Sequence, residues 1–406
     1  MNRGGLAVIA AGLAAVFSTG CEREPAERVL PFTAEEVREV LKLSPLPPTP
    51  ANPTNAVADN PAAARLGQRL FFDKRLSANG EISCATCHDP AHGFSDGKPL
   101  SEGLKPTERH SMALWNVGHQ RWFFWNGRAD SLWAQALQPL LHEKEMGVDP
   151  EHLRAVLADD ASMKADYEAI FGPLPPAANA GDRAADTLLA NFGKALEAYQ
   201  RLIVSTGAPF DRFVATMRSG GVAREPRAIS ESAQRGLQLF VGRGGCVLCH
   251  AGPNFTDGEF HNIGMAGVPP DQGRFEGIQE VRADRFNGLG EFSDDRSPAA
   301  NIKLRYLTVK LNHLGEFKTP TLRNVAGTAP YMHDGRFATL REVIDFYSEL
   351  PGEPAFGHRE DTLVPLKFTE QEKADLEAFL RTLTGAPLDA SLTQPPVASQ
   401  SMKRRN

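Results

Sequence analysis

Two short segments hold the residues best suited to chemistry. Each has two cysteines separated by two residues and followed at once by a histidine, in the sequences CATCH and CVLCH. This pattern is typical of haem c attachment, in which the thiols form thioethers with the haem and the adjacent imidazole reaches the iron. A zinc site would need four ligands that approach one another, and a redox dithiol needs no histidine. The sequence therefore predicts two covalently bound haem c groups, held by Cys84, Cys87 and His88 and by Cys246, Cys249 and His250.

The two cysteine motifs belong to an internal repeat. CATCHDPAHGFSDG is similar to CVLCHAGPNFTDG, and farther along a constant offset of 208 residues aligns Gly127-Arg128 with Gly335-Arg336. Self-similarity of this kind predicts two homologous lobes. The second copy is about 46 residues longer between its cysteine motif and its later half. We expect this insertion, residues 264–312, to be a loop.

Helical signals dominate the sequence. Thr339 and Glu342 form a capping box, and apolar residues follow it three and four positions apart. A second box joins Thr369 to Glu372, and Gly385 is the expected C-terminal cap of that helix. Strand-like alternation is sparse. The predicted fold class is therefore mainly α, with two duplicated lobes and long loops.

The ends of the chain differ from its middle in composition. An apolar stretch follows Arg3, and Ser-Thr-Gly precedes Cys21, so the first residues are predicted to be an export leader. Acylation of Cys21 and a plain secretory leader both stay open, and either one predicts a periplasmic protein. No other stretch is long and apolar enough to span a bilayer, so we expect membrane contact only through a lipid on Cys21. The predicted segments are a leader (1–21), a Pro-rich strap (22–61), an N-terminal haem domain (62–225), a C-terminal haem domain (226–388) and a disordered tail (389–406).

Charge excludes one class of partner. The 406-residue chain has a formal net charge of −6 and lacks a long basic run outside its last few residues, so we expect no nucleic-acid-binding surface.

Several longer motifs resemble one protein family. LGQRLFFDKRLSANGEISCATCH, WFFWNGRADSL, CVLCH and TPTLRNVAGTAPYMHDGRFATLREVIDFY are similar to segments of the bacterial dihaem cytochrome c peroxidase superfamily, which includes MauG. The resemblance extends from about Pro61 to Gly385. It implies two cytochrome-c-like lobes, with hydrogen peroxide reacting at the N-terminal haem and electrons entering or leaving through the C-terminal haem.

The resemblance also implies roles for single residues. Trp125 matches a tryptophan that lies between the two haems, and Glu145 and Gln135 match positions on the open side of the peroxide-reactive haem. A calcium ion between the lobes is possible and would use the carbonyls of Thr328 and Pro330. His110 stands where the family usually has an asparagine, and this removes an oxygen donor that calcium prefers.

Two departures from typical cytochrome c peroxidases resemble MauG. The loop SDGKPLSEGLKP after the first haem motif lacks the histidine that closes the N-terminal haem, although His92 and His110 flank it. Tyr347 stands at the helical position of the usual methionine ligand of the second haem. The resemblance therefore implies that His88 is the protein ligand of the first iron and that His250 and Tyr347 are the ligands of the second. Relatives associated with the copper peptide methanobactin share this pattern, so it does not identify a substrate.

Each of these roles has a structural alternative. Tyr347 could be a core aromatic, and Met332 is a rival ligand; the repeat favours Tyr347 because its counterpart is Pro139, which cannot ligate. Trp125 stands among other aromatic residues and could serve packing. Glu145 could be one of several solvated charges, but peroxide cleavage needs a group that moves a proton between the two oxygens.

Three functions fit the sequence. The preferred one is a periplasmic peroxidase that oxidises a protein partner, as MauG does. A conventional cytochrome c peroxidase, which takes electrons from a small cytochrome, is the alternative. A non-enzymatic dihaem electron carrier is the third, and it would need neither Glu145 nor an open coordination site.

Overall fold

The computed structural model describes residues 1, 29–219, 228–265 and 271–396. The fold is mainly helical, as the sequence predicts. Two short strands, β1 (Phe260–His261) and β2 (Phe317–Lys318), pair antiparallel. The α-helices are α1 (Ala34–Lys42), α2 (Pro61–Phe72), α3 (Cys84–Cys87), α4 (Leu132–Leu141), α5 (Pro150–Asp159), α6 (Ala161–Phe171), α7 (Arg183–Gln200), α8 (Pro209–Arg218), α9 (Glu231–Val241), α10 (Arg274–Ala283), α11 (Ile302–Arg305), α12 (Leu340–Glu349) and α13 (Glu370–Arg381).

Each lobe is built around a pair of closely packed helices. The pair is α2 and α7 in the N-terminal lobe and α9 and α13 in the C-terminal lobe. Each contact depends on a glycine, because a Cβ on Gly67 would lie 1.8 Å from the carbonyl oxygen of Ala195, and one on Gly236 would lie 1.9 Å from that of Asp375. Only a residue without a side chain permits such an approach.

The backbone repeats at the offset that the sequence predicts. Asn116 and Asn324 have φ values of 56° and 59°, and Phe124 and Met332 have φ values of 65° and 76°. Non-glycine residues seldom adopt positive φ, so the shared values show that both segments follow the same path. The helices α4 and α12 then begin at equivalent positions. The duplication is confirmed.

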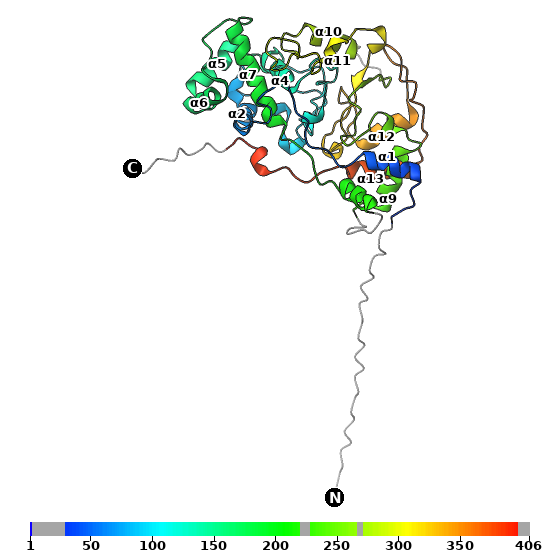
Figure 1. Ribbon diagram of the computed structural model, residues 1–406. Helices are drawn as coiled ribbons and strands as arrows, with labels where there is room; N and C mark the ends of the chain where they lie inside the picture. Colours follow the sequence, from blue (N-terminus) through cyan, green and yellow to red (C-terminus); the bar gives the residue numbers. More distant parts are fainter. Residues whose placement is uncertain (2–28, 220–227, 266–270, 397–406) are drawn as a thin grey trace.

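Each lobe also has its own hydrophobic core. The core of the N-terminal lobe includes Trp133 and Tyr199. In the C-terminal lobe, the rings of Phe240, Phe255 and Phe379 lie 5.1–6.4 Å apart. In Figure 1, α2 and α4–α7 gather at one end of the molecule, and α1, α9, α12 and α13 at the other. The helix α1, which the sequence analysis did not predict, contacts α8 and α9.

The prediction that the insertion in the second copy is a loop is wrong, because the insertion contains α10 and α11. It packs on the N-terminal lobe, where the ring of Phe286 lies 6.4 Å from that of Trp133. Ile278 and Val281 on α10 are fully buried. The insertion is rich in glycine and charge, so this small apolar face did not stand out in the sequence.

The termini differ in part from the predictions. The Pro-rich segment 43–60 has no helix or strand: residues 46–52 lack regular structure, turns follow over 53–59, and Asn52 donates a hydrogen bond of 2.6 Å to Glu197 of α7. The prediction of a disordered tail is wrong for residues 389–396. They include a 3-10 helix, Ala390–Leu392, and the carbonyl of Leu392 accepts a hydrogen bond of 2.6 Å from the Tyr199 hydroxyl. These backbone contacts give the tail a defined position that its composition did not indicate.

Two further predictions concern the ends of elements. Gly385 does not cap α13, because that helix ends at Arg381 with Thr382 as its C-cap. The backbone N–H of Gly385 instead donates to the Asn324 side chain at 2.7 Å. The leader, with Cys21, and residues 397–406 lie outside the described residues. Within the described part of the chain, no helix has the length and apolar character needed to cross a membrane.

Candidate functional site

The two CxxCH histidines are held in the same way. The His88 Nδ1 lies 3.1 Å from the carbonyl oxygen of Phe94, and the His250 Nδ1 lies 3.0 Å from that of Phe255. A hydrogen bond at Nδ1 fixes the tautomer and leaves Nε2 free to ligate a metal. Burial lowers the pKa of both histidines, which favours the neutral, ligating form. Both imidazoles are thus prepared for the same coordination chemistry.

The cysteines of the motifs fit thioether chemistry better than redox or zinc chemistry. Burial raises the pKa of Cys84, Cys87 and Cys246 to about 12, whereas a reactive dithiol needs a lowered pKa. The described residues bring one group of potential metal ligands together, namely Cys249, Asp257 and His261, whose ligand atoms lie within 4.8 Å of one another. This group has three members rather than the four of a structural zinc site, and Asp257 and His261 already form an ion pair at 2.8 Å.

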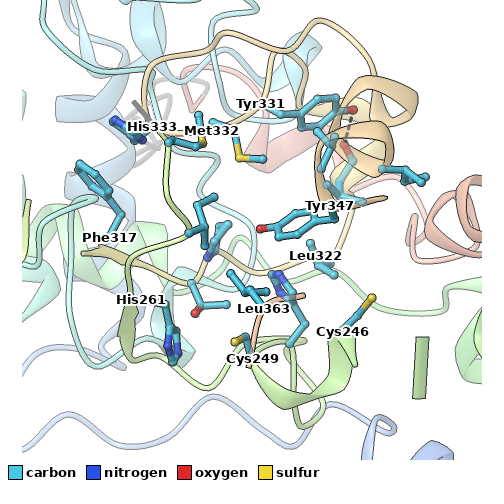
Figure 2. A pocket seen from close by; sticks show the side chains of 18 of the residues that line it. Cys246, Cys249, His261, Phe317, Leu322, Tyr331, Met332, His333, Tyr347 and Leu363 are labelled. Atoms are coloured by element: carbon cyan, nitrogen blue, oxygen red, sulfur yellow. Dashed lines mark hydrogen bonds between the residues drawn. The ribbon is translucent and has the colours of Figure 1, made fainter. Parts of the chain in front are cut away.

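A cavity of about 270 Å³ lies over the C-terminal motif. It is bordered by Cys246, Cys249 and His250 and by Tyr347 of α12. Figure 2 shows the ring of Tyr347 extending into this space from α12. Met332, the rival ligand, also borders the cavity.

The Tyr347 hydroxyl has no protein hydrogen-bond partner among the described residues. The neighbouring Tyr331, in contrast, donates to the carbonyl of Val325 at 3.0 Å. A phenol enclosed by protein and left without a partner needs one inside the cavity, and burial raises its pKa. The residues of this cavity therefore fit a haem, which Cys246 and Cys249 would hold and whose iron His250 and Tyr347 could ligate.

The N-terminal motif faces a different set of groups. Glu145 lies in the turn after α4, with its backbone N–H donating to the carbonyl of His142 at 2.9 Å. Burial is the main cause of the raised pKa of Cys84 and Cys87, and the negative charge of Glu145 adds to it. The Glu145 carboxylate therefore lies near the first motif. Burial raises the pKa of Glu145 itself, and the positive charge of Arg128 opposes this.

Gln135 and Pro139 lie on α4 at positions that share one face of the helix. Pro139 is the counterpart of Tyr347, so the face of α4 that corresponds to the Tyr347 face of α12 carries Gln135 and no ligating side chain. Two histidines could still have closed this site. His92 is mostly exposed and pairs with Asp89 at 2.9 Å, and both ring nitrogens of His110 have partners, at 2.8 Å from the Lys98 carbonyl and 3.3 Å from the Ser95 hydroxyl.

Trp125 joins the two lobes. Its indole N–H donates to the carbonyl of His110 at 2.9 Å, and its ring lies 6.4 Å from the ring of His333. The His333 ring stacks on Phe317 of β2 at 3.7 Å. Trp125 also borders the C-terminal cavity, although it belongs to the N-terminal half of the repeat. An aromatic side chain therefore lies at the boundary between the two motifs.

The residues implied for calcium border the same cavity. Thr328 and Pro330 line it together with His110. The backbone N–H of His110 donates to the carbonyl of His333 at 2.8 Å, which is a contact between the lobes. The hydrogen bonds of the His110 ring connect it to the N-terminal lobe, and a neutral imidazole is a poor ligand for calcium. Calcium binding stays a prediction.

Sequence comparisons place this arrangement in a family. The chain is 34% identical over 353 residues to the methylamine utilization protein MauG of Methylorubrum extorquens, covering 86% of this chain and 85% of the relative. It belongs to the di-haem cytochrome c peroxidase family. The sequence model of that family matches residues 61–219. Membership implies two haem c groups and makes the protein a haem oxidoreductase.

Further relatives carry both peroxidase and MauG names. The cytochrome-c peroxidase IdrP1 of Denitromonas iodatirespirans is 36% identical over 365 residues, covering 87% of each chain. Among solved structures, a MauG-like protein associated with microbial copper homeostasis superposes with a TM-score of 0.65 at 28% identity, over 86% of this chain and 98% of that one. The diheme peroxidase BthA of Burkholderia thailandensis has the same fold, with a TM-score of 0.64 at 23% identity, over 86% of this chain and 92% of that one.

The sequence analysis missed two residues of the C-terminal cavity. His261 on β1 lies between Asp257 and Glu360, at 2.8 Å from each, and Lys318 on β2 borders the cavity. Each is a single charged residue outside the haem motifs, and such residues are usually solvated. The available signal was the position of Lys318 directly before the TPTLRN motif.

Proposed function

We propose that the protein is a periplasmic di-haem c peroxidase that reduces hydrogen peroxide at the N-terminal haem and oxidises a protein partner through the C-terminal haem, in the manner of MauG. The main support is the difference between two equivalent helices: α12 presents Tyr347 to its cavity without a hydrogen-bond partner, and α4 carries Pro139 at the same position. This difference leaves one site open for peroxide and closes the other.

The attachment groups follow from the two motifs. Cys84 and Cys87 would hold the N-terminal haem and Cys246 and Cys249 the C-terminal one. His88 and His250 would each supply a ligand to an iron, and Tyr347 would supply the second protein ligand in the C-terminal site. When bound, the two haems supply the irons that exchange electrons with peroxide and with the partner. The chain positions these groups and controls protons around them.

Glu145 acts as the proton carrier of the N-terminal site. Its carboxylate, near the first motif, accepts the proton of the inner peroxide oxygen and delivers it to the outer oxygen, so that the O–O bond breaks with a good leaving group. Gln135 lies on the open helix face and orients peroxide through its amide. Enclosure keeps the Glu145 pKa above that of a solvated carboxylate, which suits a group that must both accept and return a proton.

Trp125 carries the oxidising equivalent between the lobes. It belongs to the N-terminal half of the chain but borders the C-terminal cavity. Its ring lies next to that of His333, which in turn stacks on the ring of Phe317. Tyr347, when deprotonated, adds a negative charge that stabilises the oxidised C-terminal iron.

The proposed partner is another protein, which would bind at the surface of this one. The identities of 34–36% to proteins named cytochrome-c peroxidase keep a small cytochrome as the alternative donor. We place the protein in the periplasm, with acylation of Cys21 and a plain secretory leader as the two alternatives for its export segment.

The test is to mix the fully oxidised holoenzyme with hydrogen peroxide, without any reductant. We expect an immediate change of the haem spectrum, because His92 and His110, the two histidines that flank the loop after the first haem motif, are both held by other partners. Reaction only after one-electron reduction would favour the conventional peroxidase. An oxidised and reduced protein that reacts with neither peroxide nor carbon monoxide would leave the electron carrier as the function.

A further inference from the structure

The C-terminal cavity contains a lysine without a counter-ion. Lys318 lies on β2, is 2% exposed and borders the cavity. Within the described part of the chain, its ammonium group has neither an ion pair nor a hydrogen bond. Other enclosed cations do have such a partner: Lys194 pairs with Asp294 at 2.6 Å and Arg323 with Asp211 at 2.7 Å. An enclosed, unpaired ammonium group is costly, and proteins seldom retain one without a use.

The nearby carboxylates do not supply the missing partner. The charge of Asp257 acts on Lys318, but one oxygen of Asp257 is 2.8 Å from His261 and the other accepts the backbone N–H of Glu259 at 2.9 Å. Glu360 is also held by His261, at 2.8 Å. Burial lowers the pKa of Lys318 to about 8, well below that of a solvated lysine, so burial disfavours the ammonium form. A further negative charge inside the cavity would stabilise this form.

We propose that Lys318 binds a propionate carboxylate of the C-terminal haem. The cavity bordered by Lys318 is the one that contains Cys246, Cys249, His250 and Tyr347, and haem c brings two carboxylates into any site that it occupies. The inference rests on the proposed haem at this motif. Lys318 is a positioning residue: its ammonium group donates to a propionate oxygen and fixes that edge of the haem.

The same strand connects this contact to Trp125. The backbone N–H of Lys318 donates to the carbonyl of Trp125 at 2.8 Å, and the adjacent Phe317 stacks on His333. A propionate held by Lys318 is therefore fixed relative to the indole that carries charge between the lobes. The positive charge also favours the reduced state of the iron, because it stabilises the form with one more electron.

The experiment is a redox titration of the holoenzyme at pH 7, below the Lys318 pKa of about 8, followed through the low-spin haem absorption. At the parent's midpoint potential, Lys318→Met should raise the ratio of ferric to ferrous C-terminal haem about tenfold, equivalent to a fall of about 59 mV. Lys318→Arg should restore most of the parent value because it keeps the charge. Lys310→Met is the matched control: Lys310 is an exposed lysine outside the cavity, and its loss should leave the titration unchanged.

The outcomes separate this inference from the proposed function, because a potential is measured without peroxide. A Lys318→Met protein with two haems and a ratio within twofold of the parent would overturn the inference, as would an equal shift in Lys310→Met. Haem content is measured as the pyridine haemochrome, and one haem per chain in the parent would instead refute the proposed site. If Lys318→Met fails to fold, a crystal structure of the parent decides: we expect the ammonium nitrogen about 3 Å from a propionate oxygen, and a nitrogen turned away from both propionates contradicts the proposal.

Discussion

Replacing Glu145 by glutamine tests the proton step of the proposed reaction. The change keeps the size of the side chain and removes its ability to accept a proton. The Glu145 side chain is only 26% exposed, so bulk water is a poor substitute for its carboxylate. General acid–base groups contribute about 10²- to 10⁴-fold to such steps, or about 2.7–5.4 kcal/mol of the barrier. We expect the rate constant for peroxide reaction to fall by an amount within this range.

The direction of the pH dependence follows from the environment of Glu145. Burial raises its pKa, and Arg128 and His142 oppose this only in part. The carboxylate form, which accepts the proton, is present above that raised pKa. The parent's rate should therefore decrease as the pH falls through it, and the rate of Glu145→Gln should lack this decrease.

The assay is stopped-flow mixing of the diferric protein with excess peroxide over a series of pH values. Glu143→Gln is the matched control, since the Glu143 side chain is 77% exposed, lies two residues away and is 3.8 Å from Lys105. The control should keep the parent's rate. A Glu145→Gln protein that reacts within threefold of the parent, or a control that slows equally, would refute the assignment.

Three further predictions concern the C-terminal site and the link between the lobes. Tyr347→Phe should alter the low-spin haem spectrum, because it removes the proposed iron ligand; Tyr331→Phe, whose hydroxyl donates to the carbonyl of Val325 at 3.0 Å, should leave that spectrum unchanged and lower the free energy of unfolding by about 1 kcal/mol. Two unchanged spectra would contradict the ligation. Trp125→Phe should retain the rate of peroxide reaction and slow donor oxidation about tenfold or more in steady-state assays, a barrier of at least about 1.4 kcal/mol. Incubation with EGTA should leave the low-spin spectrum unchanged, since His110 replaces an oxygen donor; a spectral change reversed by calcium would contradict this.

The features that could be predicted from the sequence are those fixed by short-range patterns. The box from Thr339 to Glu342 forms as expected, because both of its hydrogen bonds lie within one turn of helix. The repeat was visible because Asn116 and Asn324 share a backbone conformation that few residue types adopt easily. The two haem motifs could be located from the spacing of their cysteines and histidine alone.

The features that could not be predicted depend on contacts between distant segments. The insertion becomes helical because Ile278 and Val281 are buried, and no local period in that stretch stands out from its glycine and charge. The tail is held by hydrogen bonds from Gln68 of α2 and Tyr199 of α7. Gln68 and its partner Gln394 are 326 residues apart in the sequence. Lys318 looked like an ordinary surface lysine, and only the cavity distinguishes it.

The two lobes suggest how one scaffold supports two different haem environments. The helices α4 and α12 begin at equivalent positions of the repeat, so Pro139 and Tyr347 occupy the same step of the two helices. In the function proposed above, this single difference, proline at residue 139 and tyrosine at residue 347, would leave one iron open and close the other. In the same proposal, Glu145 and Lys318 would add opposite charges to the two sites: a proton acceptor beside the N-terminal haem and a cation beside the C-terminal one. Trp125 extends from the first lobe to the cavity of the second, so the proposed charges would act at the two ends of one path, and neither site would need a change of fold to acquire its role.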